Sequence, residues 1–312
     1  MTQEQRQAPP RFAPISALDQ AEKALDRGAA LVVSISGGKD SQAMALALAE
    51  LHRQRGWTGP IVALHADLGR VEWEGDPEIA GFRSAPEQVE KIAADAGLPL
   101  YVVHRNDGQD MIDHWEARAK KLAGTGKPFW SSSSARYCTS DMKRDPMDIW
   151  TRAQGWTEVV VAEGLRAQES EARAKKARWQ VRSKLKTRKR SAWTWRPIFD
   201  WDVLDVWRAM GTSWWELRQK QEAWRSGDTS ALADWPGAPA YVLGNSRLSC
   251  AMCVLASPTD LVNGARHNPN TWREMRRLER QYGSKFTVKL SLEEIGRRAG
   301  LVEATQELEA AA

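Results

Sequence analysis

Residues 31–41 have the sequence LVVSISGGKDS, in which an apolar run leads directly into a glycine-rich loop. The run over 31–35 predicts a buried strand, and residues 40–55 predict a helix that ends near Gly56. A glycine-rich turn that opens a helix presents backbone N–H groups and the positive end of the helix to an anion. This stretch therefore predicts a strand–loop–helix unit with an anion site at its turn.

Strands and helices alternate beyond this unit. Further strands are expected at 60–67, 99–104 and 157–163. The helices between them are expected at 84–96, 109–122 and 140–154. Strands that alternate with helices of this length indicate βαβ units, and hence an α/β fold with a parallel sheet and helices on both of its faces.

The pattern changes after Gly164, where the strand signal stops and a basic segment and a tryptophan-rich region follow. Helices are expected at 203–210, 214–225, 259–266, 270–282 and 292–299. We therefore expect an N-terminal segment and helix over 1–29, a Rossmann-type nucleotide-binding domain over 30–165, and a mostly helical accessory region over 166–312.

The composition is that of an ordinary globular protein. Of the 312 residues, 42% are hydrophobic and 27% are charged, which excludes a disordered chain or a coiled-coil rod. No apolar run approaches the roughly 18 residues that a membrane-spanning helix needs, and the first residues lack the apolar core of a secretory signal. We therefore expect a cytoplasmic protein with no membrane partner. Three cysteines do not make a disulfide framework.

The residue types in the loop suit phosphate chemistry. Gly37 and Gly38 let the backbone approach a phosphate with no Cβ in the way. Lys39 can add a positive charge, and Asp40 can hold Mg²⁺, which prefers oxygen ligands. Hydroxyl groups come from Ser36 and Ser41. The spacing matches neither a Walker loop nor a dinucleotide loop. The alternative is a structural tight turn before a capped helix.

The SGGKDS motif of residues 36–41 resembles the signature of the PP-loop ATP pyrophosphatases. Three further stretches narrow the resemblance: HADLG at 65–69, EGLRAQES at 163–170, and PIFDW at 197–201 followed by DVW at 205–207. Together they resemble the phosphoadenosine phosphosulfate (PAPS) reductase family of that superfamily, from about residue 30 to 210 and on to the cysteine motif near 260. The resemblance implies an adenine nucleotide alpha hydrolase-like fold that binds ATP with Mg²⁺.

The resemblance also implies which residues hold the nucleotide. The loop Ser36–Ser41 would bind the phosphates, with Asp40 on the magnesium ion. Residues near the adenosine would be Ala63, His65, Asp67 and Gly164. Arg166 would reach the phosphates or the substrate. The alternative for Arg166 is an ordinary salt bridge with Glu169.

The cysteines allow several chemistries. Cys250 and Cys253 form a CxxC pair, which can be a redox pair, half of a zinc or iron–sulfur site, or two packed thiols. Iron–sulfur members of the family carry a Cys-Cys pair before a later CxxC. Cys138 matches the first of that pair, and Thr139 stands where the second would be. The resemblance thus implies three thiolates that can hold a [4Fe–4S] cluster with one open iron, as in PP-loop enzymes of tRNA 2-thiolation.

Two departures from the sulfate-assimilating reductases favour sulfur transfer over sulfonucleotide reduction. Those reductases usually have a degraded loop, whereas the intact loop of this chain suits ATP. They also carry a catalytic cysteine near the C-terminus, and no cysteine follows Cys253.

Residues 172–190 hold ten of the 45 Lys and Arg residues and no acidic residue, so the rest of the chain is net acidic. A local basic run of this kind predicts an anionic partner such as nucleic acid, with Trp179, Trp193 and Trp195 available to stack on bases. A solvated loop with no specific role is the alternative.

These observations favour an enzyme that binds ATP, adenylates an oxygen of its substrate with release of pyrophosphate, and transfers sulfur to nucleic acid. The expected catalytic residues are Lys39, Asp40, Cys138, Cys250 and Cys253. A sulfur donor such as a cysteine desulfurase is an expected partner. The alternatives are a PAPS or APS reductase, and a nucleotide- and nucleic-acid-binding subunit without turnover.

Overall fold

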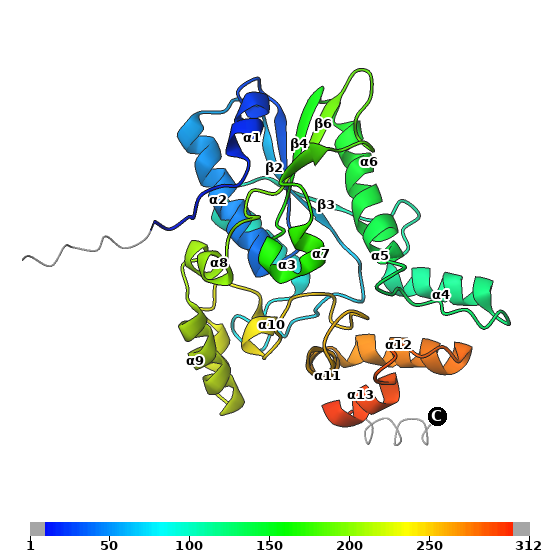
Figure 1. Cartoon of the computed structure of the whole chain (residues 1–312). Helices are drawn as coiled ribbons and strands as arrows, with labels where there is room; N and C mark the ends of the chain where they lie inside the picture. The colour runs from blue at the N-terminus through cyan, green and yellow to red at the C-terminus, as the bar shows by residue number, and fades with distance from the viewer. Residues whose placement is uncertain (1–9, 302–312) are drawn as a thin grey trace, which may run out of the picture.

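The computed structural model describes residues 10–301, which form a six-stranded sheet with helices on both faces (Figure 1). The strands are β1 (Ala30–Ser34), β2 (Ile61–Ala66), β3 (Leu100–Val103), β4 (Glu158–Glu163), β5 (Trp179–Val181) and β6 (Ser191–Trp195). Their order across the sheet is β3-β2-β1-β4-β6-β5, and every neighbouring pair is parallel except β5 with β6. The predicted parallel α/β fold is confirmed.

The helices follow the expected pattern closely. Those of the first half are α1 (Leu18–Leu25), α2 (Lys39–Arg55), α3 (Ala85–Ala96), α4 (Met111–Leu122), α5 (Tyr137–Thr139), α6 (Asp145–Ala153) and α7 (Glu171–Ala174). Those of the second half are α8 (Val203–Ala209), α9 (Trp214–Arg225), α10 (Pro239–Val242), α11 (Pro258–His267), α12 (Pro269–Tyr282) and α13 (Leu292–Ala299). The expected helix over 140–154 is interrupted, because Ser140–Arg144 form a π-helical turn before α6.

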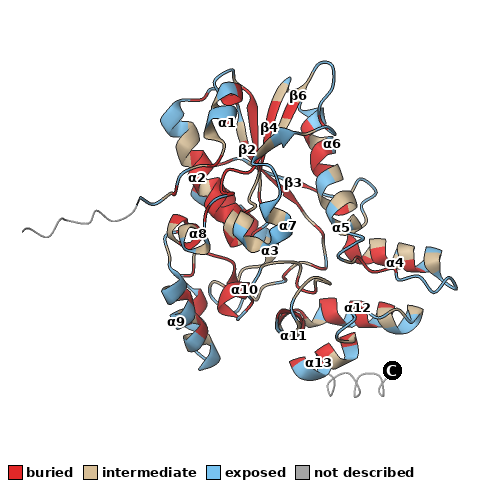
Figure 2. Ribbon diagram, viewed as in Figure 1, coloured by how far each residue is buried: buried red, intermediate tan, exposed pale blue. Residues whose placement is uncertain are grey.

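The sheet is buried on both faces, as the pleat of β1 shows. Leu31 and Val33 pack with Leu48 of α2 in the largest hydrophobic core. Val32 points to the opposite face and joins the core that includes Met147 of α6. Because successive residues of a strand face opposite sides, the apolar run of β1 requires helices on both faces. Figure 2 shows the resulting buried layer through the strands and α2.

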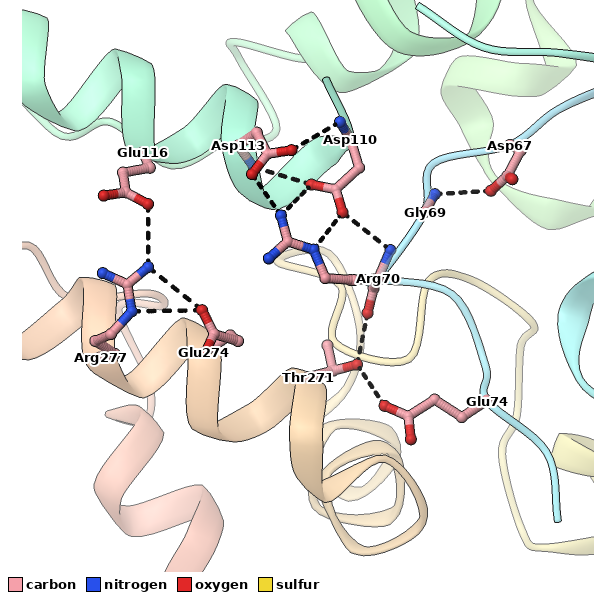
Figure 3. A network of polar contacts seen from close by, with 10 residues as sticks. All are labelled: Asp67, Gly69, Arg70, Glu74, Asp110, Asp113, Glu116, Thr271, Glu274 and Arg277. Atoms are coloured by element: carbon pink, nitrogen blue, oxygen red, sulfur yellow. Dashed lines mark hydrogen bonds and ion pairs between the residues drawn. The ribbon is translucent and has the colours of Figure 1, made fainter. Parts of the chain in front are cut away.

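A separate hydrophobic core lies below the sheet in Figure 1, where α4 packs with α11, α12 and α13. Trp272 is fully buried there against Gly296, where any Cβ would lie 2.1 Å from the indole ring. Polar contacts tie α12 to the rest of the fold (Figure 3). Arg277 donates to Glu116 of α4 at 3.0 Å, and Thr271 donates to the carbonyl of Arg70 at 2.6 Å.

The sheet does not stop at residue 165. The hairpin of β5 and β6 extends it with residues from the basic segment and from just after it. The sequence did not predict these strands, because β5 is three residues long and is surrounded by lysine and arginine. Across residues 10–301, no helix combines the length and the apolar character needed to cross a membrane.

Candidate functional site

A cleft of about 670 Å³ opens at the carboxyl ends of the parallel strands. It lies where the strand order changes direction, between β1 and β4, which is where open α/β sheets bind their ligands. The end of each neighbouring strand contributes to its walls, and so do segments much later in the chain. Residues that line the cleft include Ser36, His65, Glu72, Lys143, Glu163 and Cys250.

The glycine-rich loop between β1 and α2 is held in shape by Ser41. The Ser41 hydroxyl accepts a hydrogen bond from the backbone N–H of Ser36 at 3.1 Å and donates to the carbonyl of Gly38 at 2.8 Å. Gly37 has a φ of +78°, a conformation that strongly favours glycine. The Ser36 side chain is exposed at the cleft, whereas the Ser41 hydroxyl is used within the loop.

Asp40 is clamped between two cations. One of its carboxylate oxygens accepts from the Lys39 ammonium at 3.0 Å, and the other accepts from the Arg166 guanidinium. Burial opposes ionisation of this carboxyl group, but the charges of Lys39 and Arg166 outweigh it and lower the pKa of Asp40. The structure therefore brings together three of the residues that the sequence predicted for phosphate and metal binding.

Arg166 does not make the alternative salt bridge. The Glu169 carboxylate accepts from the backbone N–H of Arg166 at 3.1 Å and pairs with Arg173, while the Arg166 guanidinium is directed to Asp40. Gly164, just before it, packs on the start of α2. A Cβ at Gly164 would lie 3.1 Å from the Asp40 carbonyl oxygen, so the close approach of β4 to α2 favours glycine there.

Tyr241, which comes from the second half of the chain, contacts the glycine-rich loop at Lys39. Its hydroxyl accepts a hydrogen bond from the backbone N–H of Lys39 at 3.1 Å, and the Lys39 ammonium lies 5.5 Å from the centre of its ring. The neighbouring Leu248 side chain lies 3.4 Å from the position of a Cβ on Gly37. Burial raises the pKa of the Tyr241 phenol, so the hydroxyl is neutral at physiological pH.

Of the residues predicted near the end of β2, only some line the cleft. His65 lines the cleft, and Asp67 follows it, with one carboxylate oxygen accepting from the backbone N–H of Gly69 at 2.7 Å. Ala63 lies in the middle of the strand and is fully buried in the core, so its side chain does not line the cleft.

The three cysteines share a smaller pocket of about 180 Å³ that is also lined by Lys143. Cys138 comes from α5, while Cys250 and Cys253 come from the loop before α11. Burial raises the pKa of Cys250 to about 12, and the positive charge of Lys143 opposes this rise. For Lys143, burial favours the neutral form, but the thiols and Glu72 outweigh it and raise its pKa. A charged ammonium group therefore lies among three thiols.

The cysteine pocket adjoins the cleft. Residues that line both cavities are Arg136, Thr139, Lys143, Leu248, Ser249 and Cys250. Within residues 10–301, no three His, Cys, Asp or Glu side chains are close enough to hold a single metal ion. An iron–sulfur cluster is bound by thiolates that ligate different irons, so it needs a shared pocket rather than a shared point. The three thiols around Lys143 fit that requirement.

Comparisons with known proteins agree with this geometry. The model of the phosphoadenosine phosphosulfate reductase domain matches residues 30–216, which is more than half of the chain. The chain belongs to this family. The match covers all six strands and the loop.

Two relatives of the PAPS reductase-family chain are informative. Mouse cytoplasmic tRNA 2-thiolation protein 1 is 33% identical over 139 residues, which are 44% of this chain and 29% of the mouse protein. An uncharacterized 37.8 kDa protein of Escherichia phage 186 is 26% identical over 260 residues, which are 74% of this chain and 68% of the phage protein. The chain thus spans less than a third of the mouse relative.

The basic segment of this PAPS reductase-family protein is partly neutralised by its own fold. The paired side chains are Arg173 with Glu169, Arg178 with Asp200, Arg182 with Asp148 and Glu163, Lys184 with Asp145, and Arg190 with two backbone carbonyls. The exposed side chains with no ion pair in the described part of the chain are Lys175, Lys176, Lys186, Arg188 and Lys189. Only half of the run is therefore free to meet a partner.

The tryptophans near the basic segment are less available than expected. Trp179 and Trp193 stack on each other with ring centroids 5.6 Å apart. Trp195 is fully buried and donates to the carbonyl of Ser16, so its predicted role in base stacking is wrong.

Two residues of the site were not predicted. Tyr241 reaches Lys39 across 202 residues, and no local pattern marks such a contact. Glu72 follows the quoted HADLG stretch by three positions, but only the folded loop brings it to His65.

Proposed function

We propose that this chain binds Mg–ATP at its glycine-rich loop, adenylates an oxygen of an acceptor, and replaces that oxygen with sulfur delivered from its thiol pocket. The strongest support is that two cavities adjoin: the cleft beside the glycine-rich loop and the pocket of the three thiols. Lys143 and Cys250 line both of them. The similarity to a protein named for tRNA 2-thiolation supports the same chemistry.

The loop supplies the phosphate site of the proposed reaction. The start of α2 offers the positive end of a helix, and Lys39 and Arg166 hold two positive charges beside it. The lowered pKa of Asp40 keeps it ionised. Mg²⁺ would bind there in place of Lys39 or Arg166, which engage its two oxygens in this structure. The acceptor oxygen attacks the α-phosphorus and pyrophosphate leaves, so that the acceptor carries AMP on its oxygen.

The thiol pocket supplies the second half of the reaction. A sulfur nucleophile attacks the carbon that bears the adenylated oxygen, and AMP leaves with that oxygen. Lys143 stabilises negative charge on sulfur at Cys138, Cys250 or Cys253. A donor protein such as a cysteine desulfurase would load the sulfur as a persulfide on one of these thiols. After the outer sulfur bonds to carbon, a second thiol of the pocket attacks the inner sulfur, and an external thiol reduces the disulfide that forms. A cluster held by the three thiols would instead supply bound sulfide as the nucleophile.

The acceptor in this proposal is nucleic acid. Besides Lys143, three cations line the cleft with no ion pair in the described part of the chain: Arg136, Arg144 and Lys176. Lys176 also belongs to the exposed half of the basic segment, so the cleft and that segment could together neutralise the phosphates of a strand.

The decisive experiment measures pyrophosphate release from ATP in the presence of RNA or DNA. Lys39→Ala and Asp40→Ala should each reduce it by at least about 100-fold, which is the loss typical of one electrostatic contact to the transition state. Lys121→Ala, at an exposed lysine of α4, is the matched control and should keep full activity. Full turnover in both loop variants would refute the proposal.

A second measurement separates the chemistries of the thiols. Protein purified without oxygen is assayed for iron and acid-labile sulfide, with Cys138→Ala, Cys250→Ala and Cys253→Ala beside it. About four irons per chain, lost in each variant, would assign the thiols to a [4Fe–4S] cluster. Absence of iron after reconstitution would leave a persulfide route. Release of sulfite from PAPS with thioredoxin would instead establish a reductase.

A further inference from the structure

The tautomer of His65, beside the residue that precedes the glycine-rich loop, is fixed by a hydrogen bond. His65 is 4% exposed, and its Nδ1 lies 3.0 Å from the carbonyl oxygen of Ile35. A carbonyl oxygen only accepts hydrogen bonds, so Nδ1 carries a hydrogen. The other ring nitrogen, Nε2, points away from this carbonyl group.

Nε2 of His65 faces Oε2 of Glu72 at 3.6 Å. Both atoms are buried, and neither has a hydrogen-bond partner among the described residues. A neutral imidazole nitrogen and an ionised carboxylate would each point a lone pair at the other, and burial would leave both unsatisfied. The arrangement is stable when a hydrogen on Nε2 of His65 lies between the two atoms, which leaves the second carboxylate oxygen of Glu72 to accept a further proton.

Glu72 differs from the other carboxylates that line the cleft. Asp148 pairs with Arg182, and Glu163 pairs with Arg182 and Arg196, whereas Glu72 has no arginine or lysine salt bridge in the described part of the chain. Asp40, beside the loop, has both of its oxygens engaged by cations. His65 and Glu72 thus form a facing pair of titratable groups at the cleft that makes no salt bridge with arginine or lysine in the described part of the chain.

The groups that face this pair come from several elements. The Ser36 hydroxyl lies at the end of β1, Lys143 on the π-helical turn, and Cys250 on the loop before α11. The ion-paired charges on the opposite wall are Asp148, Glu163, Arg182 and Arg196. The pair therefore lies between the loop and the thiols, where the acceptor would be placed.

We propose that His65 and Glu72 act as one proton-transfer pair that accepts the proton lost by the acceptor during adenylation. This inference rests on the proposed function. As the acceptor oxygen bonds to the α-phosphorus and the bond to pyrophosphate breaks, the O–H proton or the adjacent amide N–H proton moves to the Glu72 carboxylate. His65 holds that carboxylate in place, and the proton then passes to water.

The kinetic test compares Glu72→Gln, Glu72→Asp and His65→Gln in single-turnover pyrophosphate release across pH. Glu72→Gln should slow pyrophosphate release by at least about 100-fold. It should also remove the fall in rate at low pH that protonation of a catalytic base causes, as expected for loss of a proton acceptor. Glu72→Asp should restore part of the rate. ATP affinity of the two Glu72 variants should stay within about twofold, because Glu72 is not among the residues placed on the nucleotide. Glu78→Gln, at an exposed carboxylate six residues away, is the control.

A second measurement needs no turnover. The ring ¹⁵N signals of His65, assigned by their loss in His65→Gln, should report a proton at Nε2 or a strong hydrogen bond there in the wild-type protein. Glu72→Gln should change the Nε2 signal and leave those of His104 unchanged. If Glu72→Gln left the His65 ¹⁵N signals unchanged, or left the pH dependence of pyrophosphate release unchanged, the proposal of a proton-transfer pair would be wrong. Absence of pyrophosphate release from the wild-type protein would instead overturn the proposed function.

Discussion

The hydroxyl of Tyr241 accepts a hydrogen bond from the backbone N–H of Lys39, at 3.1 Å and across 202 residues of sequence. This N–H group belongs to the first turn of α2, where a helix leaves its amides without partners inside the helix. A phenol from the accessory region thus satisfies an amide that a phosphate oxygen could also bind. The glycine-rich loop and the segment before the cysteines are therefore directly connected.

Replacing Tyr241 with phenylalanine removes the hydroxyl group that makes this hydrogen bond. The variant leaves the Lys39 amide buried without an acceptor, so the free energy of unfolding should fall by about 1–3 kcal/mol without ligand. Added Mg–ATP should recover part of this loss, because a phosphate oxygen can take the vacant hydrogen bond. Denaturant unfolding with and without Mg–ATP measures both effects. Tyr101→Phe, at an exposed tyrosine, is the control, and equal effects in the two variants would contradict the prediction.

The clamp on Asp40 predicts an acid-dependent stability. Because the pKa of Asp40 is lower in the fold than in the unfolded chain, its ionised form stabilises the fold above the unfolded pKa. That contribution is lost as pH falls through the folded pKa. Arg166→Gln should destabilise the protein by about 3 kcal/mol at pH 7, and by progressively less as the pH falls below the unfolded pKa of Asp40, where the unfolded chain takes up a proton. Unfolding measured from pH 7 to pH 3 tests this, and a pH-independent difference would contradict it.

The thiol pocket predicts slow alkylation of Cys250. Because burial raises the pKa of Cys250 to about 12, its thiol is almost entirely un-ionised at pH 8 in metal-free protein, so iodoacetamide should react far more slowly with it than with free cysteine. Lys143→Met should slow the reaction further, because it removes the charge that favours the thiolate. Lys121→Met serves as the control. A rate at Cys250 equal to that of free cysteine would show that the thiol is not shielded.

The ion pairs of the basic segment predict which lysines bind nucleic acid. Lys175 and Lys176 are exposed and have no ion pair in the described part of the chain, whereas Arg178 is paired with Asp200. The double variant Lys175→Ala, Lys176→Ala should weaken binding to single-stranded nucleic acid and reduce the salt slope by about 0.7 for each phosphate that is no longer neutralised. Arg178→Ala should change the slope less. Equal slopes in both variants would argue against binding through the free half of the segment.

Local features of this fold were predictable because local chemistry determines them. Ser84 and Glu87 predict a helix start, and the structure has the reciprocal capping box there. The glycine-rich loop likewise predicts its own position between β1 and α2. Contacts that join distant segments were not predictable in this way. Tyr241 on Lys39 and Glu72 on His65 have no signature in the sequence, because tertiary packing alone brings them together.

The strands β5 and β6 also could not be predicted from local sequence. Their sequence is dominated by the charges around them, and their place in the sheet depends on β4, which offers its free edge to β6. Two of those charges, Arg182 and Arg196, are largely buried in ion pairs with Glu163 of β4 rather than exposed. A basic run was therefore a weak guide to local structure, although it correctly marked a departure from the preceding βαβ pattern.

The dependence of the loop on Tyr241 bears on how the chain matures during synthesis. A polypeptide that has emerged only as far as residue 216 contains every strand of the sheet, the whole glycine-rich loop and Cys138. It still lacks the phenol for the Lys39 amide, the Leu248 side chain over Gly37, and two of the three thiols. The strands of the sheet are thus all synthesised before the residues that complete the glycine-rich loop and the thiol pocket, which come from the last third of the chain.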